Sequence, residues 1–434
     1  MGRFGGLRIA RNFASAHGLG RPGRRHQDFD SVEEELGLSR TFRLEVDRGA
    51  DPREVADALS SLSTVEMAEP DYLAQTTLTA APMRGGHGQA FDQVGGGAAL
   101  AVEPGDPGVT VAVVDSGIDL RHPEFRGRLV PGLDTVDLDP ERGSADLKLL
   151  GDVTGRDRIP HARHSDHGTA CAGIIGAAGA RLPRGLAGLS RVMPARALAA
   201  AVQLGEAAAA DGPAGPTRGK MTAVGALSDI DAAVKWAADL GARVLNLSFG
   251  TPEYVLAPGD RVPHAEVIRY GLARGCIFVA ASGNEGRTLR YYPAALPGVI
   301  AVGSIDASGR PSSFSTRGSH VALCAPGEDV LSASIGGYGL NTGTSFAAPF
   351  VAAAVALLIA RAARYSVPLG ASSVRSVLTT SADPFPADAD SHGCGAGILN
   401  VLEALRLIDR ELADSGVEML GPEQTVDYMQ GANP

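Results

Sequence analysis

Short apolar runs alternate with helix-like segments from residue 108 onward, and this pattern limits the fold more than any other feature of the chain. The runs at 108–119, 243–250 and 276–284 are continuously apolar and then end in polar residues. Strands that are buried on both faces of a parallel sheet have this composition. Segments with helical spacing, such as 228–242, lie between them. The sequence therefore predicts an α/β fold with a parallel sheet covered by helices on both faces.

The bulk composition excludes several classes of protein. The 434 residues are 44% hydrophobic, which is enough for one large core and a smaller unit. A net charge of −10, without a basic stripe, argues against nucleic acid as a partner. The longest apolar run, 346–360, is shorter than the ~18 residues that a membrane span needs, so we predict a buried helix. No secretory signal is evident in the first residues as written, which leaves cytoplasmic location and non-classical export open.

Five segments follow from the pattern along the chain. Residues 1–27 contain arginines but no acidic residue and are predicted to be a flexible basic tail. A compact α+β unit follows at 28–76, with a strand at 41–47, a helix at 51–62 opened by Asp51, and a strand at 64–75. The remaining predicted segments are a linker at 77–90, the α/β domain at 91–409 and a tail at 410–434. Within the α/β domain, the low-complexity stretch 194–220 is predicted to be a mobile surface insertion.

Three polar residues stand at the ends of apolar elements. Asp115 ends a predicted strand, while His167 and Ser345 each open a predicted helix. Each could be an ordinary turn or cap residue if it stood alone. Together they supply a carboxylate, a base and a nucleophile, and the carboxyl ends of parallel strands would bring them to one edge of the sheet. A serine hydroxyl becomes a good nucleophile when a neutral imidazole, oriented by a carboxylate, accepts its proton.

The residues around these three positions resemble the signature blocks of the subtilisin-like serine proteases, or subtilases. The blocks are "DSGID" at Asp115, "HGTACAG" at His167 and "GTSFAAP" at Ser345. Further similar stretches are "LNLSFG", "ASGNEG", "APGEDVLS" and "GAGILN", in the same order along the chain. The chain order Asp, His, Ser also agrees with that family, and no G-x-S-x-G elbow of an α/β-hydrolase is present.

The resemblance implies a role for each matched position. Asp115 would orient the base His167, and Ser345 would attack the peptide carbonyl. The side chain of Asn284 and the backbone N–H of Ser345 would form the oxyanion hole. The substrate-binding positions implied are Gly225, Ser248, Phe249, Gly250, Ala281, Gly283 and Tyr291. Substrate backbone would pair as an added strand between Gly225 and Ser248–Gly250, and Tyr291 would narrow the S1 pocket in favour of small or medium P1 side chains.

The same resemblance extends to the N-terminal unit, where "VEMAEPDYL" is similar to the family's inhibitory prodomain. Such a unit would make the protein a zymogen that cuts itself within about 75–90. The predicted function is therefore a serine endopeptidase acting on peptide or protein substrates. Two alternatives stay open: a maturation protease dedicated to one partner, and a catalytically silent protein that uses the fold for binding.

No cofactor is expected for catalysis, but several residues could hold a metal or form a bridge. Asp134, Asp137 and Asp139 could bind structural calcium, although a solvated acidic loop is the simpler interpretation. Glu124 matches another calcium ligand of the family, but its companion loop is not evident. For His161, His164 and Asp166 we favour an interpretation without zinc. By resemblance Cys171 is an unpaired thiol beneath His167, and a Cys324–Cys394 disulfide is left open.

Overall fold

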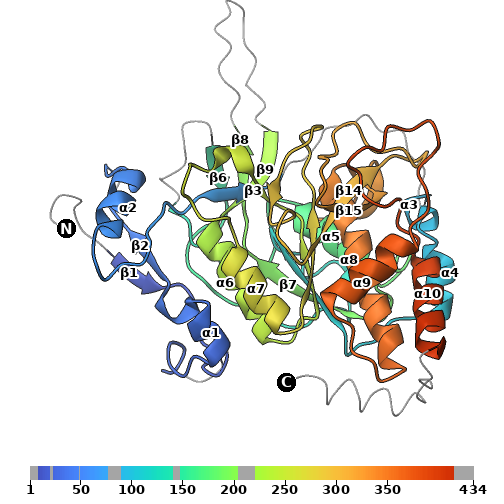
Figure 1. Cartoon of the computed structure of the whole chain (residues 1–434), viewed down its shortest axis with the longest axis horizontal. Coiled ribbons are helices and arrows are strands. Elements are labelled where there is room, and N and C mark those ends of the chain that lie inside the picture. The colour runs from blue at the N-terminus through green and yellow to red at the C-terminus, as the bar shows by residue number, and fades with distance from the viewer. Residues whose placement is uncertain are drawn as a thin grey trace, which may run out of the picture.

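The computed structural model describes residues 8–19, 23–47, 49–76, 89–139, 147–203 and 220–414 (Figure 1). Within these residues a seven-stranded sheet forms the centre of the larger unit, and all of its pairings are parallel. The strands, in spatial order, are β15 (Val321–Pro326), β14 (Val299–Ile305), β12 (Ile277–Ala281), β10 (Val244–Leu247), β4 (Thr110–Asp115), β7 (Arg191–Arg196) and β5 (Leu133–Asp134).

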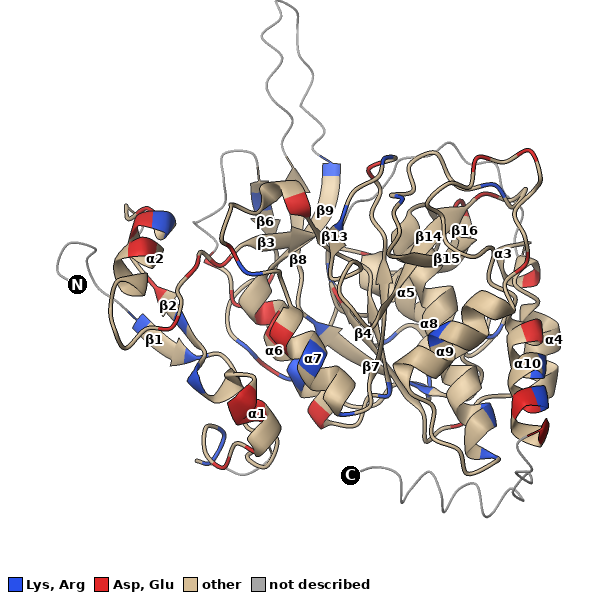
Figure 2. Ribbon diagram, viewed as in Figure 1, with Lys and Arg blue, Asp and Glu red and all other residues tan. Residues whose placement is uncertain are grey.

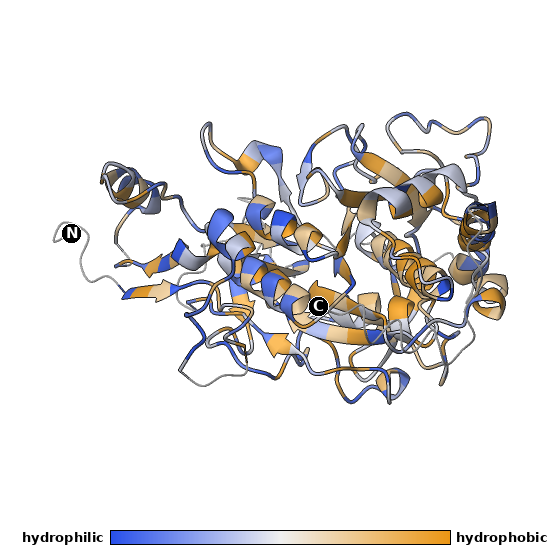
Figure 3. Cartoon of the chain, turned by 60° about the horizontal axis from the view of Figure 1, so that its bottom comes forward, coloured by the Kyte–Doolittle hydropathy of each residue, from blue (hydrophilic) through white to orange (hydrophobic). Residues whose placement is uncertain are grey.

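Helices cover both faces of this sheet, which confirms the predicted fold class. Alternate residues of β4 show the two faces. Val111 and Val113 belong to the core that contains α5 (His167–Gly176) and α8 (Thr344–Ala363). Ala112 and Val114 belong to the core with α6 (Leu227–Asp239) and α7 (Ala265–Ala273). Figure 3 shows hydrophobic residues concentrated in the interior of this unit.

The remaining elements of the larger unit are shorter or peripheral. They are α3 (Gln89–Gln93), α4 (Gly96–Val102), α9 (Ala371–Thr380), α10 (Val401–Asp414), and the two-stranded pairs β11 (Thr251–Pro252) with β13 (Tyr291–Tyr292) and β16 (Val330–Ser334) with β17 (Gly337–Asn341). Helix α10 continues past the predicted boundary at residue 409, and its Leu412 is buried, so the predicted tail begins too early. The part of that tail after residue 414 lies outside the described residues.

A second, four-stranded sheet joins the two units. Its order is β3 (Leu73–Gln75), β9 (Lys220–Ala226), β8 (Ala199–Gln203) and β6 (Leu147–Leu150), and its strands are antiparallel. The prediction of a mobile insertion over 194–220 is wrong at both ends, since residues up to 203 and residue 220 form strands that pair with each other. Residues 204–219 lie outside the described residues.

The N-terminal unit contains β1 (Arg8–Arg11), α1 (Ser31–Glu35), β2 (Phe42–Glu45), α2 (Pro52–Ser60) and β3. Helix α2 begins as predicted, because the Asp51 carboxylate accepts the N–H of Arg53 at 2.8 Å. The predicted flexible tail is wrong for residues 8–19 and 23–27. Strand β1 pairs with β2, and the Phe13 side chain is buried in the core beside α6 and α7. Residues 1–7 of that prediction lie outside the described residues.

Helix α8 is the longest apolar helix in the described part of the chain. It is the one helix there that is long and apolar enough to cross a membrane, and 94% of its most apolar stretch is buried inside the fold. A core helix passes the same test of length and composition. The buried helix that the sequence predicts at 346–360 is therefore present, and it packs directly beneath the sheet.

Candidate active site

The structure brings the three predicted catalytic side chains to one edge of the sheet. Asp115 is the last residue of β4, His167 is the first residue of α5, and Ser345 is the second residue of α8. The three side chains are buried. The ring of His167 packs on that of Phe346, next to Ser345, with 5.2 Å between the ring centroids.

The Asp115 carboxylate orients the imidazole of His167. The Nδ1 atom of His167 lies 2.8 Å from Oδ1 and 3.0 Å from Oδ2 of Asp115. The N–H of Ser116 donates to the same Oδ1 at 2.6 Å, so the carboxylate is itself held in place. A side chain at Gly168 would put its Cβ 2.3 Å from the carbonyl oxygen of Gly117, so glycine is needed for α5 to begin this close to β4. With Nδ1 protonated towards Asp115, Nε2 is left as the basic nitrogen.

The hydroxyl of Ser345 does not face His167 in this conformation. It donates to the carbonyl oxygen of Ser248 at 3.1 Å, and the buried Nε2 of His167 has no hydrogen-bond partner among the described residues. The expected serine–histidine hydrogen bond is therefore absent from this state. A rotation about the Cα–Cβ bond of Ser345 is the movement that would carry the hydroxyl from Ser248 towards Nε2. Catalytic hydrogen bonds often form only when substrate is bound.

The start of α8 is fixed by the carbonyl group of Ser345. In a regular helix this oxygen would accept the N–H of residue 349, but that residue is Pro349, which has no N–H. The oxygen instead accepts the Ser248 hydroxyl at 2.8 Å and the Cys171 thiol at 3.4 Å. Pro349 lies inside α8, beyond the first turn of the helix. It frees the carbonyl group that ties the nucleophile to α5 and to the segment after β10.

Asn284 is positioned by Thr344, a residue that the sequence reasoning missed. Its Oδ1 accepts the backbone N–H of Thr344 at 2.9 Å and the Thr344 hydroxyl at 2.8 Å. The amide nitrogen therefore lies on the side away from Thr344. This arrangement fits a side-chain donor to an oxyanion next to Ser345, as the sequence predicts. Gly343, with φ 148°, supplies the backbone bend before α8 that places Thr344 and Ser345 there.

A strand of the N-terminal unit lies between the two predicted edges of the substrate cleft. On one side, Ala74 of β3 is paired with Gly225 of β9. On the other, Gln75 and Gly250 exchange two backbone hydrogen bonds of 3.2 Å each. An extended segment thus occupies the added-strand position that the sequence predicts for substrate.

Gly225 and Gly250 have no room for a side chain because other groups of the protein lie close to them. A Cβ at Gly225 would lie 2.2 Å from the carbonyl oxygen of Ala197, and one at Gly250 would lie 2.4 Å from the ring of Tyr291. Both positions are therefore restricted to glycine by neighbouring groups of the protein, rather than by the approach of a ligand.

The ring of Tyr291 lies next to both Gly250 and Gly283, two of the positions predicted to bind substrate. It lies against Gly250 on one side, and a Cβ added at Gly283 would be 3.0 Å from its Cγ. Tyr291 is buried, and its burial raises the pKa of its hydroxyl. Ala281, at the end of β12, and Phe249 are also buried nearby.

A family model matches this chain over residues 106–397, and the model is that of the subtilase family. The chain belongs to the subtilase family. It is 33% identical over 309 residues to the thermophilic serine proteinase of Bacillus sp. (strain AK1). This match covers 70% of this chain and 65% of that protein. It is 32% identical over 279 residues to thermitase of Thermoactinomyces vulgaris, covering 64% and 81% of the two chains. The match thus spans slightly less than two thirds of the Bacillus protein.

Solved structures of proteases have the same fold as this subtilase. The prenylagaramide maturation protease PagA matches with a TM-score of 0.55 and 27% identity, over 72% of this chain and 97% of PagA. The protease domain of PatA matches with a TM-score of 0.54 and 29% identity, over 71% and 97% of the two chains.

The aspartates suggested as calcium ligands form other contacts and do not gather at one point. Asp134 is buried and forms an ion pair with Arg196. Asp137 accepts the N–H of Gly155 at 3.0 Å and lies 3.7 Å from the guanidinium of Arg43. Among the described residues, Asp134, Asp137 and Asp139 do not form a cluster of metal ligands. The calcium prediction for this loop is therefore not supported, because arginines from distant segments neutralise two of its carboxylates.

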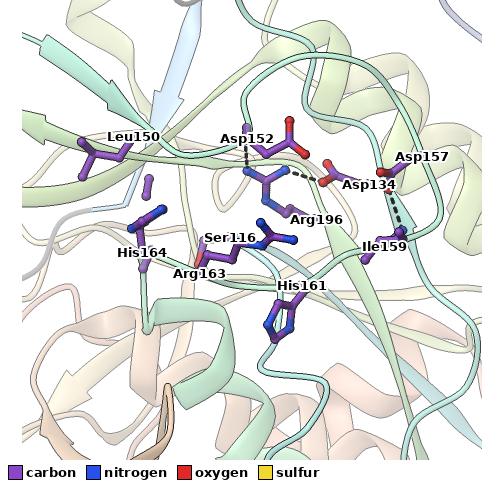
Figure 4. A pocket seen from close by; sticks show the side chains of 12 residues that line it. Ser116, Asp134, Leu150, Asp152, Asp157, Ile159, His161, Arg163, His164 and Arg196 are labelled. Carbon is purple, nitrogen blue, oxygen red and sulfur yellow. Dashed lines mark hydrogen bonds and ion pairs between the residues drawn. The ribbon is translucent and has the colours of Figure 1, made fainter.

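The ion pair of Asp134 borders a polar cavity of about 90 Å³ beside Ser116 (Figure 4). Burial raises the pKa of Asp134 to about 6, although Arg196 acts in the opposite direction. Figure 4 shows His161 and His164 on different sides of this cavity. The Nδ1 atom of His161 accepts the N–H of Leu120 at 3.2 Å.

Glu124 accepts hydrogen bonds at the position where the family resemblance suggested a calcium ligand. Four consecutive backbone N–H groups, of Gly179, Ala180, Arg181 and Leu182, donate to its buried carboxylate at 2.6–3.0 Å. Burial acts to raise the pKa of Glu124, but these hydrogen bonds outweigh it and hold the pKa below its usual value. A loop that offers N–H groups instead of oxygen atoms binds a carboxylate and not a cation.

All four cysteines are free thiols in this subtilase. The ligand atoms of Cys171, His167 and Asp115 lie within 4.8 Å of one another, and burial raises the pKa of the Cys171 thiol. The disulfide left open between Cys324 and Cys394 is not formed, and the Cys324 thiol donates to the carbonyl oxygen of Cys394 at 3.2 Å.

Replacing Glu124 by Gln should destabilise the fold in a pH-dependent way. Gln can accept only through one oxygen, which leaves buried N–H groups unpaired, so we expect a loss of ~2 kcal/mol or more in the free energy of unfolding. Because the folded-state pKa is lowered, this contribution is complete above the unfolded pKa of about 4.5 and is lost as pH falls through the folded value. Urea unfolding at pH 7 and pH 4, in a Ser345→Ala background, measures the difference.

The exposed Glu411 on α10 provides the matched control. Glu411→Gln should change the unfolding free energy by less than ~0.5 kcal/mol at either pH. Equal small effects of the two substitutions at pH 7 would contradict the role assigned to Glu124.

Proposed function

We propose that this subtilase is a serine endopeptidase that hydrolyses peptide bonds through an acyl-enzyme. Asp115 holds His167 in the tautomer whose Nε2 accepts the Ser345 proton, and Ser345 attacks the carbonyl carbon. Asn284 and the N–H of Ser345 stabilise the negative oxygen that forms. His167 then donates the proton to the leaving amine, and water hydrolyses the ester. Apart from this water and the substrate, every step uses groups of the chain itself.

One observation carries this proposal more than any other. A peptide segment, β3, is hydrogen-bonded to both edges of the cleft and runs towards the carbonyl group of Ser248, which lies 3.1 Å from the nucleophilic oxygen of Ser345. A polypeptide backbone thus fits the cleft in extended form, with the catalytic groups at its end. A fold kept only for binding would have no need of the Asp115–His167 pair at that position.

The N-terminal unit acts, in this proposal, as an inhibitory prodomain that leaves after cleavage. Its contacts with α6 suit such a release, and Figure 2 shows charged residues on both the N-terminal unit and α6. Arg43 lies 3.0 Å from the buried Asp229, and Glu33 lies 2.6 Å from the buried Lys235.

Both buried charges also have partners within the larger unit. Asp229 lies 3.1 Å from Arg156, and Lys235 lies 2.7 Å from Asp239. If the N-terminal unit left, Asp229 and Lys235 would therefore each keep one ion-pair partner. A buried charge without any partner would be costly.

A second candidate is a maturation protease dedicated to one protein or peptide. PagA, which shares the fold of this chain, is a maturation protease for prenylagaramide. The ring of Tyr291 in the S1 position favours a restricted choice of substrate over broad digestion, which agrees with this narrower role.

A fluorophosphonate probe should label the wild-type chain on Ser345 and should not label Ser345→Ala. In subtilisin, a member of the same family, loss of the nucleophile lowers kcat by about 10⁶. Loss of the oxyanion asparagine there lowers kcat by about 10²–10³. We expect similar losses here for Ser345→Ala and Asn284→Ala in assays of a fluorogenic peptide. A folded wild-type protein that stays unlabelled, with its N-terminal unit removed, would favour the catalytically silent alternative.

Shortening Tyr291 should widen the range of accepted P1 residues. Wild type should cleave peptides with Ala at P1 better than those with Phe. Tyr291→Gly should reverse that order by about tenfold or more in kcat/KM, because the ring no longer fills the pocket. Tyr254→Gly provides a control, since that tyrosine is exposed. A wild-type preference for Phe or Leu at P1 would show that the ring does not limit the pocket.

A further inference from the structure

Beside the cleft, a side chain of the N-terminal unit contacts the loop between β11 and α7. This loop spans residues 253–264. The hydroxyl of Tyr72, the residue before β3, donates to the Asp260 carboxylate at 2.6 Å. Burial, together with this hydrogen bond, raises the pKa of Tyr72 to about 12. The hydroxyl therefore keeps its proton at neutral pH and acts as the donor.

Tyr72 belongs to the same extended ladder as β3. Its carbonyl oxygen accepts the N–H of Leu227 at 2.9 Å, which continues the antiparallel pairing of Ala74 with Gly225 towards the N-terminus. Side chains two residues apart lie on the same face of a strand. Tyr72 therefore shares a face with Ala74 and Thr76, both of which are buried. A side chain at this position of the strand is thus directed towards the larger unit.

The Asp260 carboxylate is held in place by its own loop. Residues 257–260 form a turn in which the N–H of Asp260 donates to the carbonyl oxygen of Ala257 at 3.1 Å. Pro258 and Gly259, with φ 96° at the glycine, occupy the two positions that favour these residue types in a type II turn. The N–H of Ala257 donates back to Oδ2 of Asp260 at 2.7 Å. The carboxylate therefore keeps its orientation without any group of the N-terminal unit.

Two side chains of the N-terminal unit contact this carboxylate, and they differ in what they show about substrate. The guanidinium of Arg53 lies 3.4 Å from Asp260, but Arg53 comes from α2, and an extended substrate has no helix at that place. Tyr72 comes from the strand that occupies the substrate position. A substrate strand in the same register would bring its own side chain to Asp260. The contact of Tyr72 is therefore the one that a substrate can reproduce.

Asp260 would be left as a free anion if the N-terminal unit departed. Its pKa lies below the ordinary value, chiefly because the Tyr72 hydroxyl donates to it, and the carboxylate is ionised at neutral pH. Both Tyr72 and Arg53 would leave together, since they belong to the same unit. The protease would then present an oriented carboxylate beside the edge that pairs with substrate.

We propose that Asp260 and the turn 257–260 form a further substrate-binding site, which we call the Asp260 subsite. It takes a long side chain that ends in a hydrogen-bond donor, tyrosine or arginine, two residues before the substrate residue that pairs with Gly225. This inference rests on the proposed protease function and names a class of substrate for it. Binding energy gained outside the catalytic centre allows a protease to select among polypeptides.

Inhibition of the active protease by short peptides tests the Asp260 subsite. A peptide with the sequence of residues 67–76 contains β3 and the residues before it, and it should compete with a fluorogenic peptide substrate. Tyr72→Phe in this peptide removes only the hydroxyl and should raise the inhibition constant about fivefold or more. Tyr72→Arg should keep most of the inhibition, because a guanidinium also donates to a carboxylate. Tyr72→Glu should lose it, because the two charges are alike.

Asp260→Ala in the protease should remove the difference between the first two peptides. The unmodified peptide and its Tyr72→Phe form should then inhibit equally. Glu411→Ala is the matched control, since it removes an exposed carboxylate on α10 and should retain the full difference. The comparison is a ratio of two inhibition constants for one protein, so an overall loss of activity in a variant does not affect it.

Several outcomes would overturn the Asp260 subsite while leaving the protease function intact. Equal inhibition of the wild type by the unmodified peptide and its Tyr72→Phe form would show that Asp260 serves only to hold the N-terminal unit. A difference that persists in Asp260→Ala would assign the hydroxyl to another group. A substrate that is cleaved while no peptide inhibits would also exclude the subsite. A wild-type protein that neither cleaves the substrate nor reacts with a fluorophosphonate would overturn the proposed function, and the subsite with it.

Discussion

The missing N–H of Pro349 fixes the position of the nucleophile. Because residue 349 cannot donate, the carbonyl oxygen of Ser345 accepts the hydroxyl of Ser248 and the thiol of Cys171. Ser248 follows β10, and Cys171 lies in α5 one turn after His167. A single carbonyl group therefore connects the first turn of α8 to the element that carries the base and to the edge of the cleft. The 20-residue helix behind it is almost entirely buried, so this end has little freedom to move.

The rest of the site depends on this connection. The parallel sheet brings Asp115 and the segments that follow β10 and β12 to the same edge, where α5 and α8 begin. Thr344, next to Ser345, sets the orientation of Asn284. The carbonyl group of Ser248, which accepts the Ser345 hydroxyl, belongs to the same segment that pairs with β3. A small set of groups, chiefly Thr344 and the backbone of Ser248, thus positions the nucleophile, the oxyanion donor and the backbone of a bound strand relative to one another.

Much of this could be predicted from the sequence because it depends on local patterns. Continuously apolar runs that end in polar residues identified the strands, and they placed Asp115, His167 and Ser345 at element ends. The features that were missed depend on partners far away in the sequence. Strand β1 exists because it pairs with β2, and its own composition resembles a tail. The calcium interpretation is not supported, because Asp134 pairs with Arg196 and Glu124 accepts N–H groups more than fifty residues away. The side-chain conformation of Ser345 carries no sequence signal at all.

The most direct test of this account is the rate at which a fluorophosphonate labels Ser345 in a Pro349→Ala variant whose N-terminal unit has been removed. Restoring the N–H would return the Ser345 carbonyl group to the helix and loosen its bonds to Ser248 and Cys171. We predict that the second-order labelling rate falls by about tenfold, equivalent to ~1.4 kcal/mol in the barrier, while the unfolding midpoint is retained or raised. An unchanged labelling rate would show that the carbonyl group of Ser345 does not position the nucleophile.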